Sequence, residues 1–220
     1  MPEISIIIRT KNEEKWIPHC LGMIFEQDYN DFEVIIVDNN SSDHTVEVVK
    51  RYPVASIINI DKFIPGKAIN DGIRASTGDY IVCISAHCIP KDNQWLGNLY
   101  SNFKDNNKIA GVYGRQLPMA YTSDADKRDL LITFGLDKKS QVKDYFSIMR
   151  IACFPDLFGM SFLLMKKRQI LRIEFGVRRL QRLAIKSSMS QVHQFTIIMD
   201  YTSMRVHQIE PKVLQPYWIG

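Results

Sequence analysis

Apolar runs separated by polar segments divide the first half of the chain into alternating predicted strands and helices. Strands are predicted at residues 4–8, 33–37, 55–60, 80–84 and 109–114. Between them, apolar residues at helical spacing predict helices over residues 14–27, 43–51, 65–78 and 95–103. Unbroken β-branched runs are typical of strands buried on both faces. The alternation predicts an α/β fold with a doubly wound, mostly parallel sheet.

Three of the predicted strands end in polar clusters. Arg9–Glu13 follows the first strand, Asp38–Asp43 the second, and Ser85–His87 the strand at residues 80–84. In an open parallel sheet, ligands bind in the crevice outside the carboxyl ends of the strands. Turn-forming residues alone would explain one such cluster. Three clusters at one edge of a sheet favour a ligand site, and Asp43 is also expected to cap the helix that follows it.

Composition narrows the class of protein. The chain of 220 residues is 45% hydrophobic and 24% charged, as expected for a soluble α/β domain with a sizeable core. No apolar run reaches the roughly 20 residues of a membrane span, and residues 1–4 do not resemble a secretory signal. The spacing of Cys20, Cys83, Cys88 and Cys153 does not suggest a metal site. We expect reduced thiols in a cytoplasmic protein.

The charge changes sign near Phe146. Residues 1–146 carry 17 Lys and Arg against 20 Asp and Glu, whereas residues 147–220 carry 11 against 4 and contain six of the nine Met residues. We therefore predict two regions, a domain over residues 1–146 and an atypical basic tail over residues 147–220. Taken at face value, Leu163–Arg172 suggests an amphipathic helix at an anionic membrane surface.

The first region resembles the family-two nucleotide-sugar glycosyltransferases, which have the GT-A fold. The resemblance covers roughly residues 3–115 and lies in five segments in the family's order, namely Ile6–Glu13, Val37–Thr45, Gly66–Ile73, Gly78–Ile81 and Ser85–His87. It implies a nucleotide-binding α/β domain and sugar transfer from a nucleotide-sugar donor to an acceptor hydroxyl. Polysaccharide biosynthesis is a common setting of the family. A glycan or lipid-linked acceptor is expected.

The resemblance also implies roles for particular residues. Thr10, Glu13 and Asp38 would line the nucleoside pocket, and Lys67 and Asn70 would lie near the ribose or the diphosphate. The full set of predicted donor-binding residues is Arg9, Thr10, Glu13, Asp38, Asn40, Lys67, Asn70, Ser85 and His87.

One departure concerns the metal. The family usually has an Asp-x-Asp motif at the end of the fourth strand, where it holds a divalent cation against the diphosphate, and this chain has Ser85-Ala86-His87 instead. Mg²⁺ and Mn²⁺ prefer carboxylate oxygen, although imidazole can ligate Mn²⁺. His87 is therefore either a metal ligand, with Mg²⁺ or Mn²⁺ as cofactor, or a direct donor to phosphate oxygen. A purely structural hydrogen bond is the third alternative.

The catalytic base of the family is absent in frame. The resemblance implies a Glu-Asp pair between about residues 150 and 200, and none is present. If one T is missing from the codons of Phe146 and Ser147, however, the shifted reading of residues 169–176 allows N-I-E-D-R-V-W, which contains the pair. The same shift allows F-H-N-A-N-S after Phe146, G-Y-K-I-V-Y-E-P across residues 183–191 and V-H-H-Y-H-G-L across residues 194–201. We therefore interpret the tail as a frameshifted acceptor half, poorly ordered and with little or no activity.

Three alternatives differ in class from an inactive transferase. The chain could be an active membrane-associated enzyme with Asp124, Asp126, Asp129 or Asp137 as base, at the inner surface of the membrane, or a non-enzymatic nucleotide-binding module. A nucleotidyltransferase would need a Gly-rich loop after the first strand, and residues 9–15 contain no Gly. Nucleic acid is not an expected partner, because the basic charge lies in the atypical tail and no nucleic-acid-binding motif accompanies it.

Overall fold

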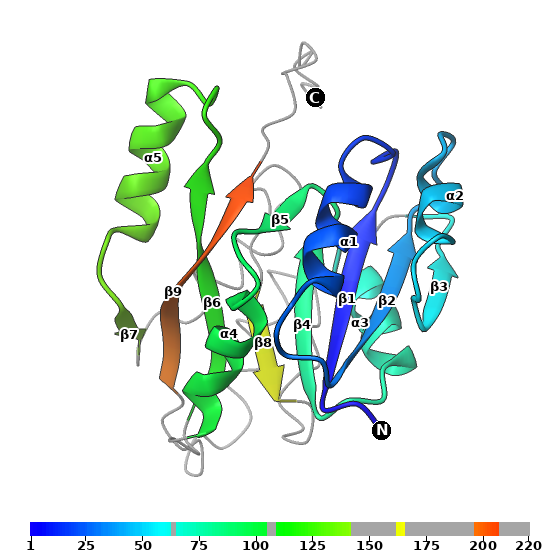
Figure 1. Ribbon diagram of the computed structural model, residues 1–220, viewed down its shortest axis with the longest axis horizontal. Coiled ribbons are helices and arrows are strands. Elements are labelled where there is room, and N and C mark those ends of the chain that lie inside the picture. The colour runs from blue at the N-terminus through cyan, green and yellow to red at the C-terminus, as the bar shows by residue number, and fades with distance from the viewer. Residues whose placement is uncertain (63–64, 105–108, 142–161, 166–195, 207–220) are drawn as a thin grey trace, which may run out of the picture.

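The computed structural model describes residues 1–62, 65–104, 109–141, 162–165 and 196–206, which form a layered α/β domain around one sheet (Figure 1). The sheet runs in the order β3-β2-β1-β4-β8-β6-β9-β5, with β7 paired to β9. β1 lies near the middle of the first half and is parallel to both β2 and β4. The expected doubly wound α/β architecture is present in this half, where β3, β2, β1 and β4 are parallel.

The first half of the chain follows the predicted alternation closely. Because their residues are mostly β-branched and apolar, the strands at its centre are covered on both faces. The elements are β1 (Ile4–Thr10), α1 (Ile17–Phe25), β2 (Phe32–Asp38), α2 (Thr45–Val49), β3 (Ser56–Asn59), α3 (Pro65–Ala75) and β4 (Tyr80–Ser85).

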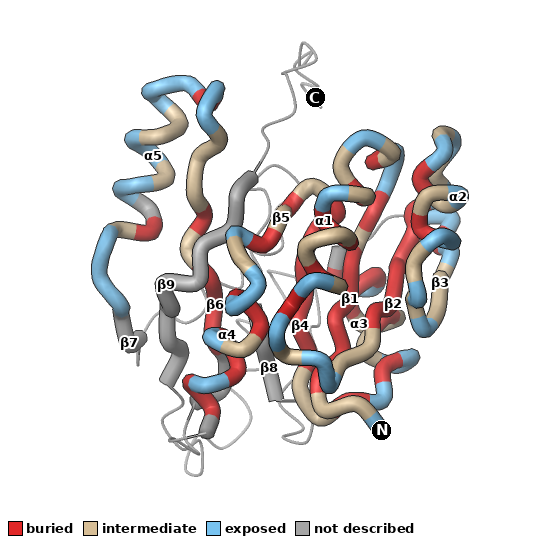
Figure 2. The backbone as a smooth tube through the Cα atoms, viewed as in Figure 1, coloured by how far each residue is buried: buried red, intermediate tan, exposed pale blue. Residues whose placement is uncertain are grey.

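Successive residues of β1 supply the two faces of the core. Ile6 and Ile8 pack in the cluster that contains Leu21 of α1 and Val49 of α2. Ile7, between them, packs in the opposite cluster, which includes Ala68 and Ile69 of α3. The tube view shows burial concentrated along these central strands (Figure 2). Helices therefore cover both faces of these strands in the described part of the chain.

The part of the chain after β4 contains both predicted and unpredicted elements. β5 (Cys88–Pro90) follows β4 after a two-residue turn, and α4 (Trp95–Lys104) and β6 (Ile109–Pro118) then match predicted elements. α5 (Asp124–Phe134) forms where we expected a polar segment, and β7 (Lys139–Gln141) follows it. Ser123 caps α5 by accepting a hydrogen bond from the Asp126 N–H at 3.2 Å, a local signal that helical periodicity does not report.

Gly78 does not end α3, contrary to prediction, because the helix stops at Ala75. Gly78 instead lies against β1, where its N–H donates to Ser5 Oγ at 2.9 Å. A Cβ at this position would lie 2.9 Å from the backbone N of Ser5. The glycine therefore serves a close approach of two backbone segments rather than a helix terminus.

Two segments of the tail lie in the sheet as strands. β8 (Phe162–Met165) is antiparallel to both β4 and β6, and β9 (Thr196–Val206) is parallel to β6. A membrane-surface helix is therefore wrong for residues 163–165. The rest of the tail, with Cys153 and the remainder of the proposed helix, lies outside the described residues. Cys20, Cys83 and Cys88 are buried thiols, as expected.

Two helical glycines test the packing of the first half. A Cβ on Gly72 of α3 would lie 2.5 Å from Ile7 Cγ2 and 3.2 Å from Val37 Cγ2, whereas a Cβ on Gly22 of α1 meets nothing within 4 Å. We expect Gly72→Ala to lower the free energy of unfolding by about 1–3 kcal/mol through overpacking. Gly22→Ala, the matched control, should raise it by about 0.5–1 kcal/mol, since alanine favours the helix. Urea unfolding measures both, and equal effects would contradict the packing of α3 on β1.

Candidate functional site at the carboxyl ends of three strands

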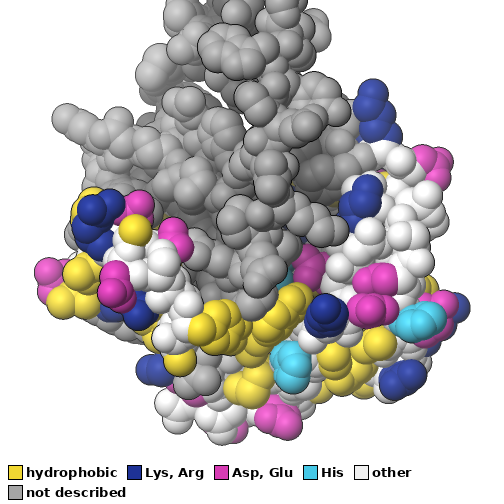
Figure 3. Space-filling model, turned by 90° about the horizontal axis from the view of Figure 1, so that it is seen from above, with side chains coloured by type: hydrophobic (Ala, Val, Ile, Leu, Met, Phe, Trp, Pro, Cys, Tyr) yellow, Lys and Arg dark blue, Asp and Glu magenta, His cyan; other side chains and the backbone are white. Residues whose placement is uncertain are grey.

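The parallel register of β1 brings the predicted site residues together. Thr10 is the register partner of Asp38 on β2, and Arg9 is the register partner of Ser85 on β4. The polar clusters that follow these strands therefore meet at one edge of the sheet, as the sequence predicted. Viewed onto this edge, described acidic, basic and histidine side chains lie close to one another on the visible surface (Figure 3).

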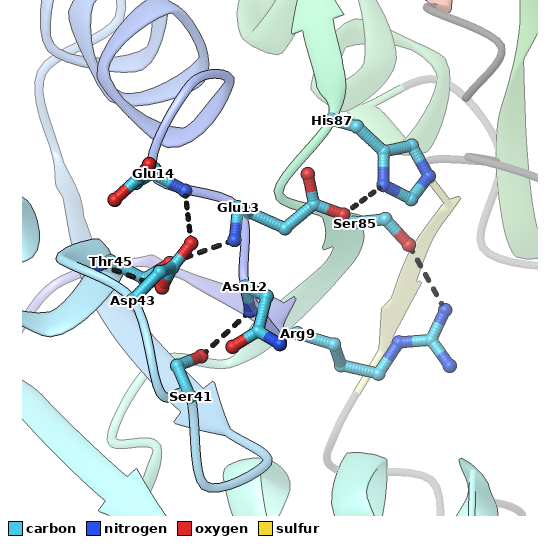
Figure 4. A network of polar contacts seen from close by, with 9 residues as sticks. All are labelled: Arg9, Asn12, Glu13, Glu14, Ser41, Asp43, Thr45, Ser85 and His87. Atoms are coloured by element: carbon cyan, nitrogen blue, oxygen red, sulfur yellow. Dashed lines mark hydrogen bonds and ion pairs between the residues drawn. The ribbon is translucent and has the colours of Figure 1, made fainter. Parts of the chain in front are cut away.

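Hydrogen bonds join the loop after β1 to the loop after β2 (Figure 4). The N–H of Asn12 donates to Ser41 Oγ at 2.9 Å, that of Glu13 to Thr45 Oγ1 at 2.7 Å, and that of Glu14 to Asp43 Oδ2 at 3.1 Å. Both loops are thereby fixed relative to each other. Sequence reasoning missed this contact, because it depends on pairing between segments about 30 residues apart.

The two asparagines of these loops adopt the left-handed conformation. φ is 53° at Asn12 and 52° at Asn40, a region that asparagine tolerates better than most residues. Asn40 is exposed, and its N–H donates to Asn59 Oδ1 at 3.2 Å. Asparagine at a strand end was the available sequence signal for such turns.

Asp43 lies just before α2 but is not the predicted helix cap, because His44 occupies the N-cap position and no side chain caps the helix there. Its Oδ1 accepts from the N–H of Thr45 at 3.0 Å, while its Oδ2 accepts from Glu14. Although burial opposes it, hydrogen bonding from the Thr45 hydroxyl and from these backbone donors holds the pKa of Asp43 below its usual value. One carboxylate thus contacts both the first residue of α2 and the junction of the two loops.

Asp38 is buried at the end of β2 and organises its own loop. Its Oδ2 accepts from the N–H of Ser41 at 2.9 Å, and its Oδ1 accepts from Ser41 Oγ at 2.5 Å. Only 3% of the residue is exposed. Each carboxylate oxygen can accept more than one hydrogen bond, so Asp38 keeps capacity for a ligand donor in a fixed orientation.

Glu13 and His87 form an ion pair between the exits of β1 and β4. His87 Nδ1 lies 2.8 Å from Glu13 Oε1, and the two side chains are 12% and 10% exposed. Burial lowers the pKa of His87, but the neighbouring Cys88 sulfur and the Glu13 carboxylate outweigh burial and raise it to about 10. The imidazole is therefore charged at neutral pH and held by a carboxylate.

Arg9 contacts the third exit. Its Nη2 donates to Ser85 Oγ at 3.3 Å, and its Nε is buried without a hydrogen-bond partner in the described part of the chain. The Oγ1 atom of the next residue, Thr10, is also buried and has no hydrogen-bond partner among the described residues. The cluster of Arg9, Thr10, Glu13, Asp38, Ser85 and His87 is called the strand-end cluster below.

The two predicted residues on α3 are less directly connected to this cluster. The ammonium of Lys67 is 2.9 Å from Asp71 Oδ2 within its own helix, and the side chain is 58% exposed. Together with Arg74, Lys67 holds the pKa of Asp71 below its usual value. Asn70, about one helical turn after Lys67 on α3, is half-buried. The hydrogen bond and ion pair that Lys67 forms among the described residues join it to Asp71 and not to the strand-end cluster.

The strand-end cluster does not match the donor set of a divalent-cation site. Within the described ranges, no group of three or more His, Cys, Asp and Glu side chains could hold a metal ion. Ser85-Ala86-His87 supplies a hydroxyl and an imidazole, and that imidazole already contacts Glu13. Magnesium and manganese favour several oxygen ligands, mainly carboxylates, and the position does not offer them.

The carboxylates considered as alternative bases lie elsewhere. Asp124 and Asp129 are exposed on α5 and pair with Lys127 and Arg128. α5 lies at the opposite end of the sheet from β1 and β2 (Figure 1). A shallow hollow beside α1 and α2 contains none of the predicted site residues, and it is lined by Glu14, Lys15, His44, Glu47, Val48 and Arg51. None of the helices in the described ranges is long and apolar enough for a membrane span.

Comparison with known proteins identifies the family. The model of glycosyl transferase family 2 matches residues 5–164, and the chain therefore belongs to this family. A dolichyl N-acetyl-glucosaminyl phosphate diacetamido-dideoxy-glucuronosyltransferase of Methanococcus voltae is 36% identical over 122 residues, which are 50% of this chain and 38% of that protein. A poly(ribitol-phosphate) β-glucosyltransferase of Bacillus spizizenii is 26% identical over 164 residues, 64% of this chain and 25% of that protein. The matches thus span well under half the length of these relatives.

Solved structures agree on the fold. The mannosyltransferase PcManGT of Pyrobaculum calidifontis, solved with GDP-Man and Mn²⁺, gives a TM-score of 0.57 at 17% identity and covers 96% of this chain and 58% of its own. A mycobacterial protein gives 0.62 at 15% identity and covers 96% of this chain and 69% of its own. At these identities the likeness concerns the GT-A fold alone.

The Glu13–His87 pair predicts a pH-dependent stability. Because the pKa of His87 in the folded state lies above its unfolded value near 6.5, the pair stabilises fully below about pH 6.5 and loses its contribution as pH rises toward 10. We expect the wild type to exceed Glu13→Gln in free energy of unfolding by about 1.5–3 kcal/mol at pH 6.5, with a smaller difference at pH 10. Glu26→Gln, on the exposed end of α1, is the control. A difference that does not change with pH would show that the pair is not ionic.

Proposed function

We propose that residues 1–146 of this family 2 chain are the donor-binding half of an enzyme that transfers a sugar from a nucleotide-sugar to an acceptor hydroxyl. The observation that carries the proposal is the register of the sheet, which sets Thr10 beside Asp38 and Arg9 beside Ser85 at one edge. Such an edge is where open α/β sheets bind nucleotides. The loops that border it are already joined by hydrogen bonds, so little ordering remains to be done on binding.

The proposed roles follow the residue chemistry. Asp38 would accept hydrogen bonds from the nucleoside, with Thr10 and Glu13 lining the same pocket and Asn40 at its rim. Lys67 and Asn70 would reach the ribose or the diphosphate from α3, a role that requires Lys67 to leave Asp71. Ser85 and His87 would border the diphosphate. A divalent cation, expected from the sequence as Mg²⁺ or Mn²⁺, would need ligands besides Ser85 and His87.

The proposed acceptor is a glycan or a lipid-linked saccharide. The Methanococcus relative is named for transfer to a dolichyl-phosphate-linked sugar, and the Bacillus relative for transfer to poly(ribitol-phosphate). Both acceptors carry sugar or sugar-alcohol hydroxyl groups on a larger carrier. A cytoplasmic location at the inner membrane surface would suit such acceptors and is part of the proposal.

We further propose that this chain transfers sugar poorly. Displacement at the anomeric carbon needs a base that takes the proton of the acceptor hydroxyl. Glu13 and Asp38, the carboxylates of the strand-end cluster, are engaged by His87 and Ser41, and those of α5 lie at the far end of the sheet. Nucleotide binding without turnover is accordingly the second candidate function.

A shift of the reading frame after Phe146 would explain the missing base. In its support, one constant shift allows four family-like segments, one of them with the Glu-Asp pair. The codon of Met is unique, so Met189 fixes the G that begins the Glu codon in G-Y-K-I-V-Y-E-P. Two findings favour the in-frame chain instead. β8 and β9 pair within the sheet, and the family match continues to residue 164.

Donor binding should depend on Asp38. We expect the chain to bind at least one nucleoside diphosphate from a panel with uridine, guanosine, cytidine and thymidine bases, and Asp38→Asn to weaken that binding roughly 10-fold or more. Asp137→Asn makes the same chemical change on an exposed residue after α5 and should leave binding unchanged. Isothermal titration calorimetry measures all three proteins. Absence of binding across the panel, or equal loss in both variants, would refute the proposed function.

The frame proposal has its own test. The coding DNA is resequenced, and a version with one T added within the codons of Phe146 and Ser147 is expressed beside the original. We expect the restored protein to release nucleoside diphosphate from a nucleotide-sugar at least 100-fold faster than the 220-residue chain, because the base is regained. If the shifted bases do not spell the Glu-Asp pair, the frame proposal is wrong and the in-frame tail is the natural one.

A further inference from the structure

Arg9 has an unusual environment for a cation. It lies within β1, between the neighbouring strands β2 and β4, and in the described part of the chain its side chain donates to a hydroxyl, Ser85 Oγ, at 3.3 Å. Its Nε is buried and has no partner within the described part of the chain. No carboxylate forms an ion pair with Arg9 among the described residues, where every ion pair involves another cation.

The carboxylates of the strand-end cluster have other partners. Glu13 is held by His87, and Asp38 by two hydrogen bonds from Ser41. In Figure 4 the side chain of Arg9 extends from β1 to Ser85, with the Glu13–His87 pair on the other side of Ser85. The arrangement keeps both anions of the strand-end cluster away from the guanidinium.

A half-buried guanidinium with a neutral partner is an incomplete site. Taking a cation out of water costs free energy that an opposite charge must offset. Guanidinium groups bind phosphate oxygens through paired N–H donors, and Nε with one terminal nitrogen forms the usual fork. Nε of Arg9 is the buried donor without a partner. The orphaned Thr10 Oγ1 lies on the adjacent residue, whose side chain points to the opposite face of β1, so Arg9 Nε is the orphaned donor on its own face.

Orphaned polar atoms alone would not define an anion site. Ser56, Trp95 and Thr122 also carry one each, outside the exits of β1, β2 and β4. Arg9 differs from them because it is charged and because it lies at the edge where parallel strands end. The charge and the position together point to an anionic ligand.

We propose that Arg9, positioned by Ser85, binds the diphosphate of the donor directly and compensates its charge, so that donor binding by this chain does not require a divalent cation. The inference rests on the proposed donor-binding function and deepens it. It agrees with the absence of a metal-ligand group in the described ranges and with the engagement of His87 Nδ1 by Glu13. Arg9 is a binding residue in this proposal, and Ser85 is a positioning residue.

The metal part of the proposal is tested on the full 220-residue chain. The nucleoside diphosphate that binds best in the panel is titrated by calorimetry twice. One titration contains EDTA, and the other contains Mn²⁺ or Mg²⁺ at about 1–5 mM. We expect Kd values within about threefold of each other. Binding that appears only with a metal ion overturns the inference while leaving the proposed function intact. No binding under either condition overturns both.

The arginine part uses variants that separate phosphate from nucleoside recognition. Arg9→Gln should weaken diphosphate binding by roughly 10- to 100-fold in EDTA, and Arg9→Lys by less, because lysine keeps the charge but loses the fork. Arg51→Gln removes the same charge from an exposed position after α2 and should change Kd less than twofold. Saturation-transfer NMR with the corresponding nucleoside, which has no phosphate, should give equal signals for the wild type and Arg9→Gln.

Each outcome of the variant experiment has a defined meaning. Loss of diphosphate affinity with an unchanged nucleoside signal supports the proposal. An unchanged diphosphate Kd in Arg9→Gln overturns it. Equal loss of nucleoside and diphosphate binding overturns it as well, because a purely structural role of Arg9 would remove the whole pocket. Inorganic diphosphate, titrated as a competitor, should lose affinity for Arg9→Gln in parallel with the nucleoside diphosphate.

Discussion

The parallel pairing of β1 with both β2 and β4 is the constraint on which the rest of the molecule depends. It places Thr10 opposite Asp38 and Arg9 opposite Ser85, which brings three polar strand exits to one edge. A shift of one residue in either ladder would turn alternate side chains to the other face of the sheet. The register is set by β-branched side chains that fill two separate core clusters, so hydrophobic packing fixes where the polar groups lie.

Hydrogen bonds and charge then determine what that edge offers to a ligand. Backbone donors of Asn12, Glu13 and Glu14 are satisfied by the loop after β2, which leaves side chains rather than backbone for recognition. The two carboxylates of the strand-end cluster are neutralised or hydrogen-bonded by residues of the chain itself, whereas Arg9 has only a hydroxyl. Among the described residues, the edge therefore presents a fixed acceptor at Asp38 and a cation at Arg9 without a counter-ion. A nucleoside diphosphate combines donors and an anion in one molecule.

Apolar periodicity in the sequence predicted most strands and helices of the first half of the chain. The apolar runs of β1, β2 and β4 and the amphipathic α1, α3 and α4 were identified within a few residues, and so was the meeting of the three strand exits. Gly78 was misread because its close approach to Ser5 depends on a contact between distant segments. β5 and β7 are too short to show a period, and β8 owes its place between β4 and β6 to pairing alone. The partners of Glu13 and Arg9 likewise depend on nonlocal geometry and could not be derived from residue type.

Hydrogen–deuterium exchange with mass spectrometry, performed on the full chain with and without a saturating nucleoside diphosphate in EDTA, is the most direct test of the central claim. The claim is that one donor site is built from the exits of β1, β2 and β4. The account predicts slower exchange in three separate peptides that contain residues 9–14, 38–43 and 85–88, and unchanged exchange in α5. Protection confined to the surface beside α1 and α2, or spread evenly over the chain, would contradict it.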